Sequence, residues 1–326
     1  MSGHAPSANG EMSAARHGDE AAAATMAPLR GTWGTALLPV RPDESIDFAA
    51  LEVELDALFE VGLAGVYTCG TAGEFHTLEE DEFDKLSELV AQKAGQARAA
   101  FQIGASHMSG QVSLSRIRRA RALGPTAIQV ILPDWLPLSP SEVERALDGM
   151  LEAAGGIPLV LYNPPHAKTA CSPEQLGALA RAFPGMVGVK VAGDDAFYSR
   201  LHAAAPHLSI FAPGHELAHA RRLGAVGSYS NVACLAPAGA LAWERQMDQD
   251  PVAAEALGDR IMAFFDAYIG PLKARGYSNT ALDKALAAVG AWAPIGTRTR
   301  WPYNSVPDEE VAVLGPLARA ALPELF

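Results

Sequence analysis

Short apolar runs alternate with longer amphipathic stretches along most of this chain. From residue 31 onward, β-branched and apolar runs are followed by segments in which apolar residues recur every three or four positions. The first pattern is typical of buried strands, and the second of helices that pack on one face. The expected strands are residues 33–40, 64–68, 100–104, 126–132, 157–162, 186–191, 208–212 and 225–229. The expected helices between them are residues 47–61, 79–94, 109–123, 140–154, 173–182, 194–204 and 215–223.

This alternation predicts an α/β fold, a (β/α)8 TIM barrel with a C-terminal helical extension. Strands that are each followed by a helix fit a closed barrel better than an open sheet. After the last strand only helical patterns follow, at residues 236–247, 251–275, 279–289 and 307–323. We therefore divide the chain into a disordered tail (1–28), a catalytic barrel (29–232) and a helical extension (233–326).

Composition and charge narrow the class of protein. With 326 residues and 49% hydrophobic content, the chain can bury a large core. The formal net charge of −12 argues against nucleic acid or an anionic membrane surface as the main partner. No apolar run reaches the roughly 18 residues that span a bilayer. The first 28 residues lack the basic start and apolar stretch of a secretory signal.

The cysteines indicate the redox setting. Cys69, Cys171 and Cys234 are odd in number and widely spaced, so they suggest neither a disulfide framework nor a CxxC metal site. Together with the lack of a recognisable signal, this pattern predicts a reducing, cytoplasmic location.

One charged side chain lies within an otherwise apolar expected strand. Lys190 is in the run Met-Val-Gly-Val-Lys-Val at residues 186–191. Removing an ammonium group from water is costly and lowers its pKa, and an amine with a lowered pKa is a nucleophile that can form a Schiff base. The alternative is a lysine at a strand end whose stem packs on apolar neighbours while its amine reaches water. The segment alone favours this alternative.

Two other segments follow expected strands. Gly70-Thr71-Ala72-Gly73-Glu74 comes after the second strand, and its glycines allow a sharp turn that presents N–H groups to an anion. An ordinary turn between strand and helix explains this segment equally well. Tyr162-Asn163-Pro164-Pro165 comes at the end of the fifth strand, where a phenol can relay protons or simply cap the core. Barrel chemistry lies at the C-terminal ends of the strands, so we expect both segments and Lys190 on one face.

These three segments resemble, in this order, motifs of the pyruvate-dependent class I aldolases, which include dihydrodipicolinate synthase and N-acetylneuraminate lyase. The turn at residues 70–74 is similar to the family's GTTGE, residues 162–165 to YN-x-P, and residues 188–190 (Gly-Val-Lys) to G-x-K. Supporting matches are Leu37-Leu38-Pro39-Val40 and the run Gly-Ala-Val-Gly-Ser-Tyr-Ser-Asn at residues 224–231. The resemblance extends from about residue 31 to the C-terminus.

The resemblance implies a mechanism and a set of roles. Lys190 forms a Schiff base with pyruvate or another 2-keto acid, and Tyr162 shuttles protons. Thr71 and Ala72 bind the carboxylate of the keto acid through backbone N–H groups, and the Thr71 hydroxyl joins the proton relay. The backbone around Tyr229 closes the pyruvate pocket. The iminium is an electron sink for aldol cleavage, condensation or dehydration, and no metal or organic cofactor is required.

The family also implies a homo-oligomer, a tetramer or a dimer, but two departures concern the substrate. Dihydrodipicolinate synthases carry a pair of tyrosines after the fourth strand, where this chain reads Pro133-Asp134-Trp135-Leu136. Their carboxylate-binding arginine corresponds to Ala167. We therefore do not expect this protein to act in lysine biosynthesis.

Further partial matches suggest other substrates without naming one. Trp135 resembles a tryptophan of the hydratase-aldolases that cleave arylidene-pyruvates, and Gly73-Glu74-Phe75 resembles the turn of ketodeoxyglucarate dehydratases. Two roles remain open for Trp135, contact with the substrate and packing against another subunit. His166 and Lys168 are positioned to meet a distal polar or anionic group, whereas Lys168 is equally well explained as a solvated side chain.

A competing motif is His215-Glu216-Leu217-Ala218-His219, which matches the HExxH pattern of zinc hydrolases. Glu244 lies 25 positions after His219, a separation compatible with a third zinc ligand. The motif directly follows a strand and a Pro-Gly pair, so it begins a short helix at the barrel rim, where capping or lining the mouth is the simpler role. A zinc-dependent hydrolase and a non-catalytic barrel that binds a keto acid are thus the alternatives to a lyase.

Overall fold

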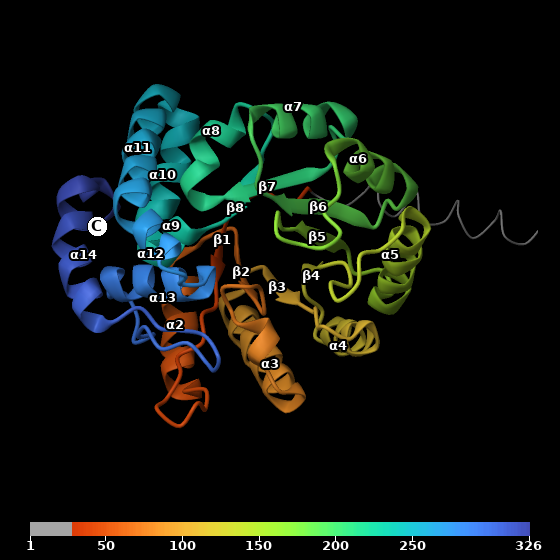
Figure 1. Cartoon of the computed structure of the whole chain (residues 1–326), viewed down its shortest axis with the longest axis horizontal. Helices are drawn as coiled ribbons and strands as arrows, with labels where there is room; N and C mark the ends of the chain where they lie inside the picture. Colours follow the sequence, from red (N-terminus) through yellow and green to blue (C-terminus); the bar gives the residue numbers. More distant parts are fainter. Residues whose placement is uncertain (1–27) are drawn as a thin grey trace, which may run out of the picture.

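The computed structural model describes residues 28–326, which form a closed barrel of parallel strands (Figure 1). Each strand pairs with the next along the chain, and the last pairs with the first. The strands are β1 (Gly31–Thr35), β2 (Gly65–Thr68), β3 (Phe101–Gly104), β4 (Ala127–Val130), β5 (Leu159–Asn163), β6 (Met186–Val191), β7 (Ser209–Pro213) and β8 (Gly227–Tyr229). The prediction of a closed α/β barrel is confirmed. The expected disordered tail lies outside the described residues, apart from Pro28.

Helices cover the outside of the strands. They are α2 (Phe48–Val61), α3 (Glu80–Ala97), α4 (Gly110–Ala122), α5 (Pro140–Ala154), α6 (Pro173–Ala182), α7 (Asp195–Ala204) and α8 (Leu217–Arg221). Short 3₁₀ turns, η1 (Phe75–Thr77) and η2 (Gly214–Glu216), precede α3 and α8. Local sequence sets the ends of these helices. For example, the Asp47 carboxylate accepts hydrogen bonds from the first N–H groups of α2, and Gly62 ends this helix in a left-handed conformation.

The remaining helices gather on one side of the barrel in Figure 1, beside β1 and α2. They are α9 (Asn231–Leu235), α10 (Pro237–Gln249), α11 (Pro251–Phe264), a π-helical turn η3 (Phe265–Ile269), α12 (Gly270–Ala274), α13 (Asn279–Gly290), α14 (Asp308–Ala321) and a final 3₁₀ turn η4 (Pro323–Leu325). The division at residues 232 and 233 stays a prediction, and it falls within α9, which packs on both β1 and α13. In the described part of the chain, no helix is both long and apolar enough to cross a bilayer.

Three of the differences from the sequence prediction have a clear local reason. β1 ends at Thr35 instead of continuing to residue 40, because the Leu37 N–H donates to the buried Glu54 carboxylate (2.6 Å) instead of to a neighbouring strand. The expected single helix at 251–275 contains a π-helical turn, because Pro271 lacks an N–H and the Gly270 N–H donates to Phe265. α9 was not expected, and the Ser230 hydroxyl caps its first turn.

The core has two layers. A large apolar layer lies between the strands and the surrounding helices. A smaller cluster fills the barrel interior and is mainly aromatic: Trp33, Tyr67, Ala127, Val160, Phe211 and Tyr229. Because side chains alternate along a strand, residues two positions apart share the interior face. On β5 the interior face therefore continues from Val160 to Tyr162, and Lys190 of β6 is the residue paired with Tyr162.

Candidate active site

Lys190 and Tyr162 lie side by side at the C-terminal ends of two neighbouring strands. They are paired residues in the register of β5 and β6, so their side chains point the same way, into the barrel mouth. The Lys190 Nζ lies 4.4 Å from the centre of the Tyr162 ring. The predicted meeting of the amine and the phenol on one barrel face is therefore confirmed by the geometry.

The Lys190 amine lies among aromatic rings. Its Nζ lies 5.3 Å from the centre of the Tyr229 ring and 5.5 Å from that of Tyr67. Among the described residues no carboxylate comes within 4.0 Å of the amine. Burial lowers the pKa of Lys190 to about 8, and the charge of Asp283 on α13 partly opposes the change. The neutral fraction of this amine near pH 7 is therefore much larger than that of an exposed lysine, whose pKa is about 10.4.

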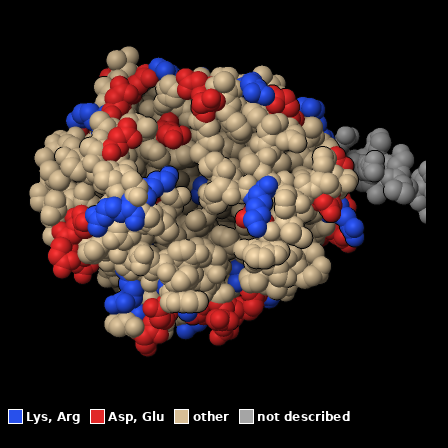
Figure 2. All heavy atoms as spheres, viewed as in Figure 1, with Lys and Arg blue, Asp and Glu red and all other residues tan. Residues whose placement is uncertain are grey.

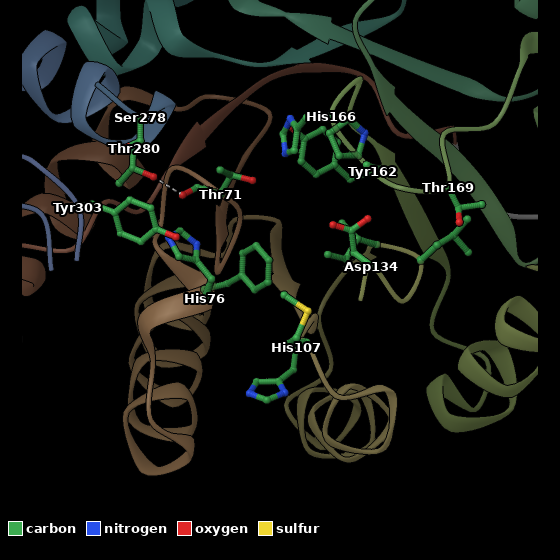
Figure 3. A pocket seen from close by; sticks show the side chains of 16 residues that line it. Thr71, His76, His107, Asp134, Tyr162, His166, Thr169, Ser278, Thr280 and Tyr303 are labelled. Atoms are coloured by element: carbon green, nitrogen blue, oxygen red, sulfur yellow. Dashed lines mark hydrogen bonds between the residues drawn. The ribbon is translucent and has the colours of Figure 1, made fainter. Parts of the chain in front are cut away.

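Tyr162 shares its surroundings with the turn after β2. Burial raises the pKa of the phenol, and the neighbouring Thr71 side chain opposes this rise. Both residues line the same cavity (Figure 3). The phenol is therefore protonated at neutral pH, as a proton donor to a carbonyl oxygen must be.

The turn at residues 70–74 is held by buried contacts. The Glu74 carboxylate forms a fully buried ion pair with Lys284 of α13 and accepts a hydrogen bond from the Arg300 N–H (2.9 Å). Thr280, also on α13, donates its hydroxyl to the Thr71 carbonyl (2.7 Å; Figure 3). The C-terminal helices thus fix the turn in the barrel mouth.

The glycines of this turn serve close packing, which differs from the role expected of them. The left-handed residues are Cys69 and Glu74, with φ of 54° and 52°. A Cβ on Gly73 would lie 2.9 Å from the Ala36 carbonyl oxygen, and one on Gly70 would lie 2.7 Å from the Tyr67 ring. Strain at two non-glycine residues is typical of a functional turn that its surroundings hold in place.

Ala72 and Tyr229 are both buried. Ala72 is buried within the turn, and neither residue is among those that line the cavity. The Tyr229 hydroxyl donates to Gln102 (2.6 Å), and its ring meets that of Tyr67 edge-on at 4.6 Å. The Tyr229 ring lies beside the Lys190 amine in the barrel interior, and its expected part in closing a pyruvate pocket stays a prediction, as does that of Ala72.

A cavity of about 330 Å³ opens in front of Tyr162 and Thr71. On this face of the molecule most acidic side chains stand toward the periphery, and a few Lys or Arg side chains lie in and beside the central hollow among uncharged atoms (Figure 2). Asp134 is the only Asp, Glu, Lys or Arg among the lining residues that the structure describes. The wall consists of Thr71, Phe75, His76, His107, Met108, Ile131, Leu132, Asp134, Tyr162, Pro164, His166, Ala167, Thr169, Ser278, Thr280 and Tyr303.

The loop after β5 carries His166 to the cavity, where Figure 3 shows it beside Tyr162. Asn163 shapes this loop, since its side chain exchanges two hydrogen bonds with the backbone of Cys171 (2.8 and 3.0 Å). Trp135 is not among the residues that line the cavity, and it is 68% exposed. Lys168 lies beside it, donating to the Trp135 carbonyl (2.7 Å). A role for Trp135 in substrate contact stays a prediction.

The HExxH residues have partners of their own. The His215 ring pairs with the Asn231 side chain (2.8 Å) and stacks on Phe265, whereas the His219 Nε2 contacts Asp195 (2.7 Å). Glu244 accepts a hydrogen bond from the Thr32 N–H of β1 (2.9 Å). No group of three or more His, Cys, Asp or Glu side chains within residues 28–326 is arranged to hold a metal ion. The described residues therefore do not bring together the three ligands of the alternative zinc site.

Several residues of the site were missed from sequence. His76, His107 and Tyr303 line the cavity from loops that carry no distinctive motif. Thr280 and Asp283 come from α13, far along the chain from the strands. Asp283 and Lys284 are the only charged residues of the otherwise mostly apolar α13, which is a pattern that the sequence alone displays. Only the fold shows that this helix lies against the turn after β2 at the barrel mouth.

Comparison with known proteins assigns the family. The model of the dihydrodipicolinate synthetase family matches residues 28–318, so the chain belongs to this family. A 4-hydroxy-tetrahydrodipicolinate synthase from Sorangium cellulosum is 29% identical over 172 residues, which are 52% of this chain and 56% of that protein. A DapA-like lyase from Thermococcus kodakarensis is 27% identical over 172 residues, 53% of this chain and 58% of that protein. The matches thus span a little over half the length of these relatives.

Solved structures show the same fold at low sequence identity. The dihydrodipicolinic acid synthase family protein YagE of Escherichia coli K12, solved with pyruvate, superposes with a TM-score of 0.81 at 19% identity, covering 92% of this chain and all of that chain. A sialic acid aldolase from Ruminococcus gnavus gives a TM-score of 0.80 at 18% identity, covering 91% and 99% of the two chains. These likenesses establish the barrel with its C-terminal helices as a shared architecture.

Proposed function

We propose that this protein is a class I lyase that forms a Schiff base between Lys190 and pyruvate or another 2-keto acid. The observation that carries the proposal is the pairing of Lys190 with Tyr162 at the mouth of the barrel, next to an open cavity. An amine with a pKa near 8 beside a protonated phenol provides both the nucleophile and the proton donor. Family membership supports the same reaction class.

The chemistry follows from these groups. The lone pair of the neutral Lys190 amine adds to C2 of the keto acid, and the carbonyl oxygen takes up a proton through Tyr162 and Thr71. Loss of this oxygen as water leaves an iminium, which accepts the electron pair of the bond that breaks next, giving an enamine. Protonation of the enamine at C3 and hydrolysis of the resulting iminium release the product and restore the amine. No step needs a metal or an organic cofactor.

The outer part of the cavity favours a substrate whose tail carries no charge. Ala167, at the position of the family's carboxylate-binding arginine, lines the cavity without offering a charge. The single acidic group there, Asp134, already accepts the Lys168 N–H (2.7 Å). Burial lowers the pKa of His76, which keeps this ring neutral near pH 7. Phe75, Met108 and Tyr303 add apolar surface. We infer an electrophile with an apolar or aromatic tail and without a second carboxylate, and not the substrate of lysine biosynthesis.

The other expectations remain proposals of the same kind. A homo-oligomer fits the exposure of Trp135 and Leu136, both 68%, because side chains of this type commonly lie in subunit contacts. A cytoplasmic location fits the three free, buried cysteines. A non-catalytic barrel that binds a keto acid is the second candidate, and it predicts binding without turnover.

Turnover of a keto-acid series tests the proposal. The substrates are 4-hydroxy-2-keto acids that differ only in the tail, which is alkyl, aryl or carboxylate, and the readout is release of pyruvate. We expect release from the apolar-tailed acids and at least about tenfold less from the dicarboxylate, since an uncompensated charge would enter an apolar wall. Preference for the dicarboxylate would contradict the inferred tail, and binding without release would favour the non-catalytic barrel.

A further inference from the structure

The helix α13 carries a carboxylate without a partner at the barrel mouth. Its two charged residues are Asp283 and Lys284, and Lys284 is neutralised by Glu74. Asp283 is only partly exposed, yet no described residue donates it a hydrogen bond or forms an ion pair with it within 4.0 Å. A carboxyl group held away from bulk water without a partner either takes up a proton or relies on a compensating charge nearby.

The helix geometry directs Asp283 toward the site. Asp283 follows Thr280 by three positions, so the two residues share one face of α13. The Thr280 hydroxyl donates to the Thr71 carbonyl and lines the cavity, as Figure 3 shows. The face that carries Asp283 is therefore the face that covers the barrel mouth. Neighbouring α9, which packs along α13, contributes Cys234 to the same region.

Lys190 provides the compensating charge. Burial raises the pKa of the Asp283 carboxyl to about 7, which is the larger effect, whereas the charge of Lys190 lowers this pKa. Burial has the larger effect on Lys190 and lowers the pKa of its amine. The Asp283 carboxylate acts in the opposite direction and raises this pKa. The other titratable groups that face Asp283 are Tyr67 of β2, Tyr162 of β5 and Cys234 of α9. All three are uncharged near neutral pH because their pKa values are raised.

We propose that Asp283 is the counter-ion of the Lys190 nitrogen and stabilises the iminium that forms there. The inference rests on the proposed function. When the neutral amine has added to the keto acid, and the carbonyl oxygen has taken up a proton through Tyr162 and left as water, the nitrogen carries one positive charge among aromatic rings. The carboxylate offsets this charge until the electron pair of the breaking bond reaches the nitrogen and neutralises it. Asp283 is thus a positioning residue that acts through Lys190.

The pH dependence of adduct formation provides the test. Pyruvate is added to the full-length protein, samples are quenched with borohydride over a range of pH, and the intact mass gives the initial rate. In the wild type the rate rises with pH through about 8, because the amine must lose its proton before it attacks. Asp283→Asn removes the negative charge that favours the ammonium form, so the midpoint falls by about one unit. Turnover falls about tenfold, because the iminium loses its counter-ion.

Controls separate this role from a structural one. Asp283→Glu restores the wild-type midpoint at least in part, whereas Asp134→Asn, which removes a carboxylate from the outer wall, leaves the midpoint unmoved. Asp283→Val, an apolar residue on an apolar helix face, is the second variant if Asp283→Asn does not fold. An unchanged midpoint in the folded charge-removing variant overturns the inference and leaves the proposed function standing. Absence of any adduct in the wild type overturns both.

Discussion

The turns after β2 and after β7 both match short sequence motifs, but only the first brings its residues to an open cavity. The turn at residues 70–74 lies against an open cavity, with Tyr162 and Lys190 beside it. The HExxH segment at residues 215–219 has its imidazoles turned to separate partners, Asn231 and Asp195. A motif indicates a site only where the fold brings its polar groups to a shared space that a ligand can enter.

The two turns also differ in how they are held. The Glu74 carboxylate is fixed by Lys284 and the Arg300 N–H, which come from helices and loops more than 200 positions away. The HExxH segment is held mainly by contacts along α8 and its neighbours, such as the stacking of His215 on Phe265. The distant supports of the first turn are consistent with a requirement for precise placement.

The largest effect is expected at the amine. Lys190→Ala should abolish both the pyruvate adduct and turnover, because no other described lysine lies at the barrel mouth beside Tyr162. Mass spectrometry after borohydride treatment measures this, with Lys190→Arg as a control that keeps the positive charge but cannot form a Schiff base at neutral pH. A full yield of adduct in Lys190→Ala would remove the mechanism.

Removal of the phenol should have the next largest effect. Tyr162→Phe retains the ring that packs beside Lys190 but loses the proton donor, so turnover should fall by about 10²-fold or more while slow adduct formation persists. Steady-state rates combined with adduct kinetics make this measurement. Turnover equal to that of the wild type would take Tyr162 out of the reaction.

The buried support of the first turn should matter for stability. Lys284→Met leaves the Glu74 carboxylate buried without its cation, which should cost about 3–5 kcal/mol in the free energy of unfolding. Denaturant titration measures the loss, and the double variant Glu74→Gln/Lys284→Met should recover part of it. If the single and double variants are equally unstable, the ion pair is not what holds the turn.

A new charge in the outer wall should change selectivity by a smaller factor. Ala167→Arg places a guanidinium among the cavity-lining residues, so the preference for dicarboxylate over apolar-tailed keto acids should rise about tenfold. The ratio of kcat/KM for the two classes is the readout, with Ala167→Gln as an uncharged control of similar length. An equal change with glutamine would point to size instead of charge.

The smallest effect is expected at the turn after β7. His219→Ala removes an exposed imidazole whose side-chain hydrogen-bond partners among the described residues are Asp195 and Arg222, so turnover should stay within about twofold of the wild type. Assays of keto-acid turnover and of bound zinc, made on the same samples of wild type and variant, test this prediction. Loss of activity accompanied by loss of bound zinc would reverse the comparison between the two turns.

Much of the fold was predictable because periodicity records which face of each element is buried. The alternation of apolar runs gave the eight strands and most helices, and the three motifs located the amine, the phenol and the turn. α9 was missed because its five residues are too few to display a period. The part of the site built by Thr280 and Asp283 was missed because their place over the barrel mouth depends on the packing of α13.

The most direct measurement is peptide mapping of the wild-type protein after incubation with pyruvate and borohydride. The account predicts a single reduced pyruvyl group on the peptide that contains Lys190. A protein that stays unmodified under these conditions, or a pyruvyl group on another lysine, would contradict it.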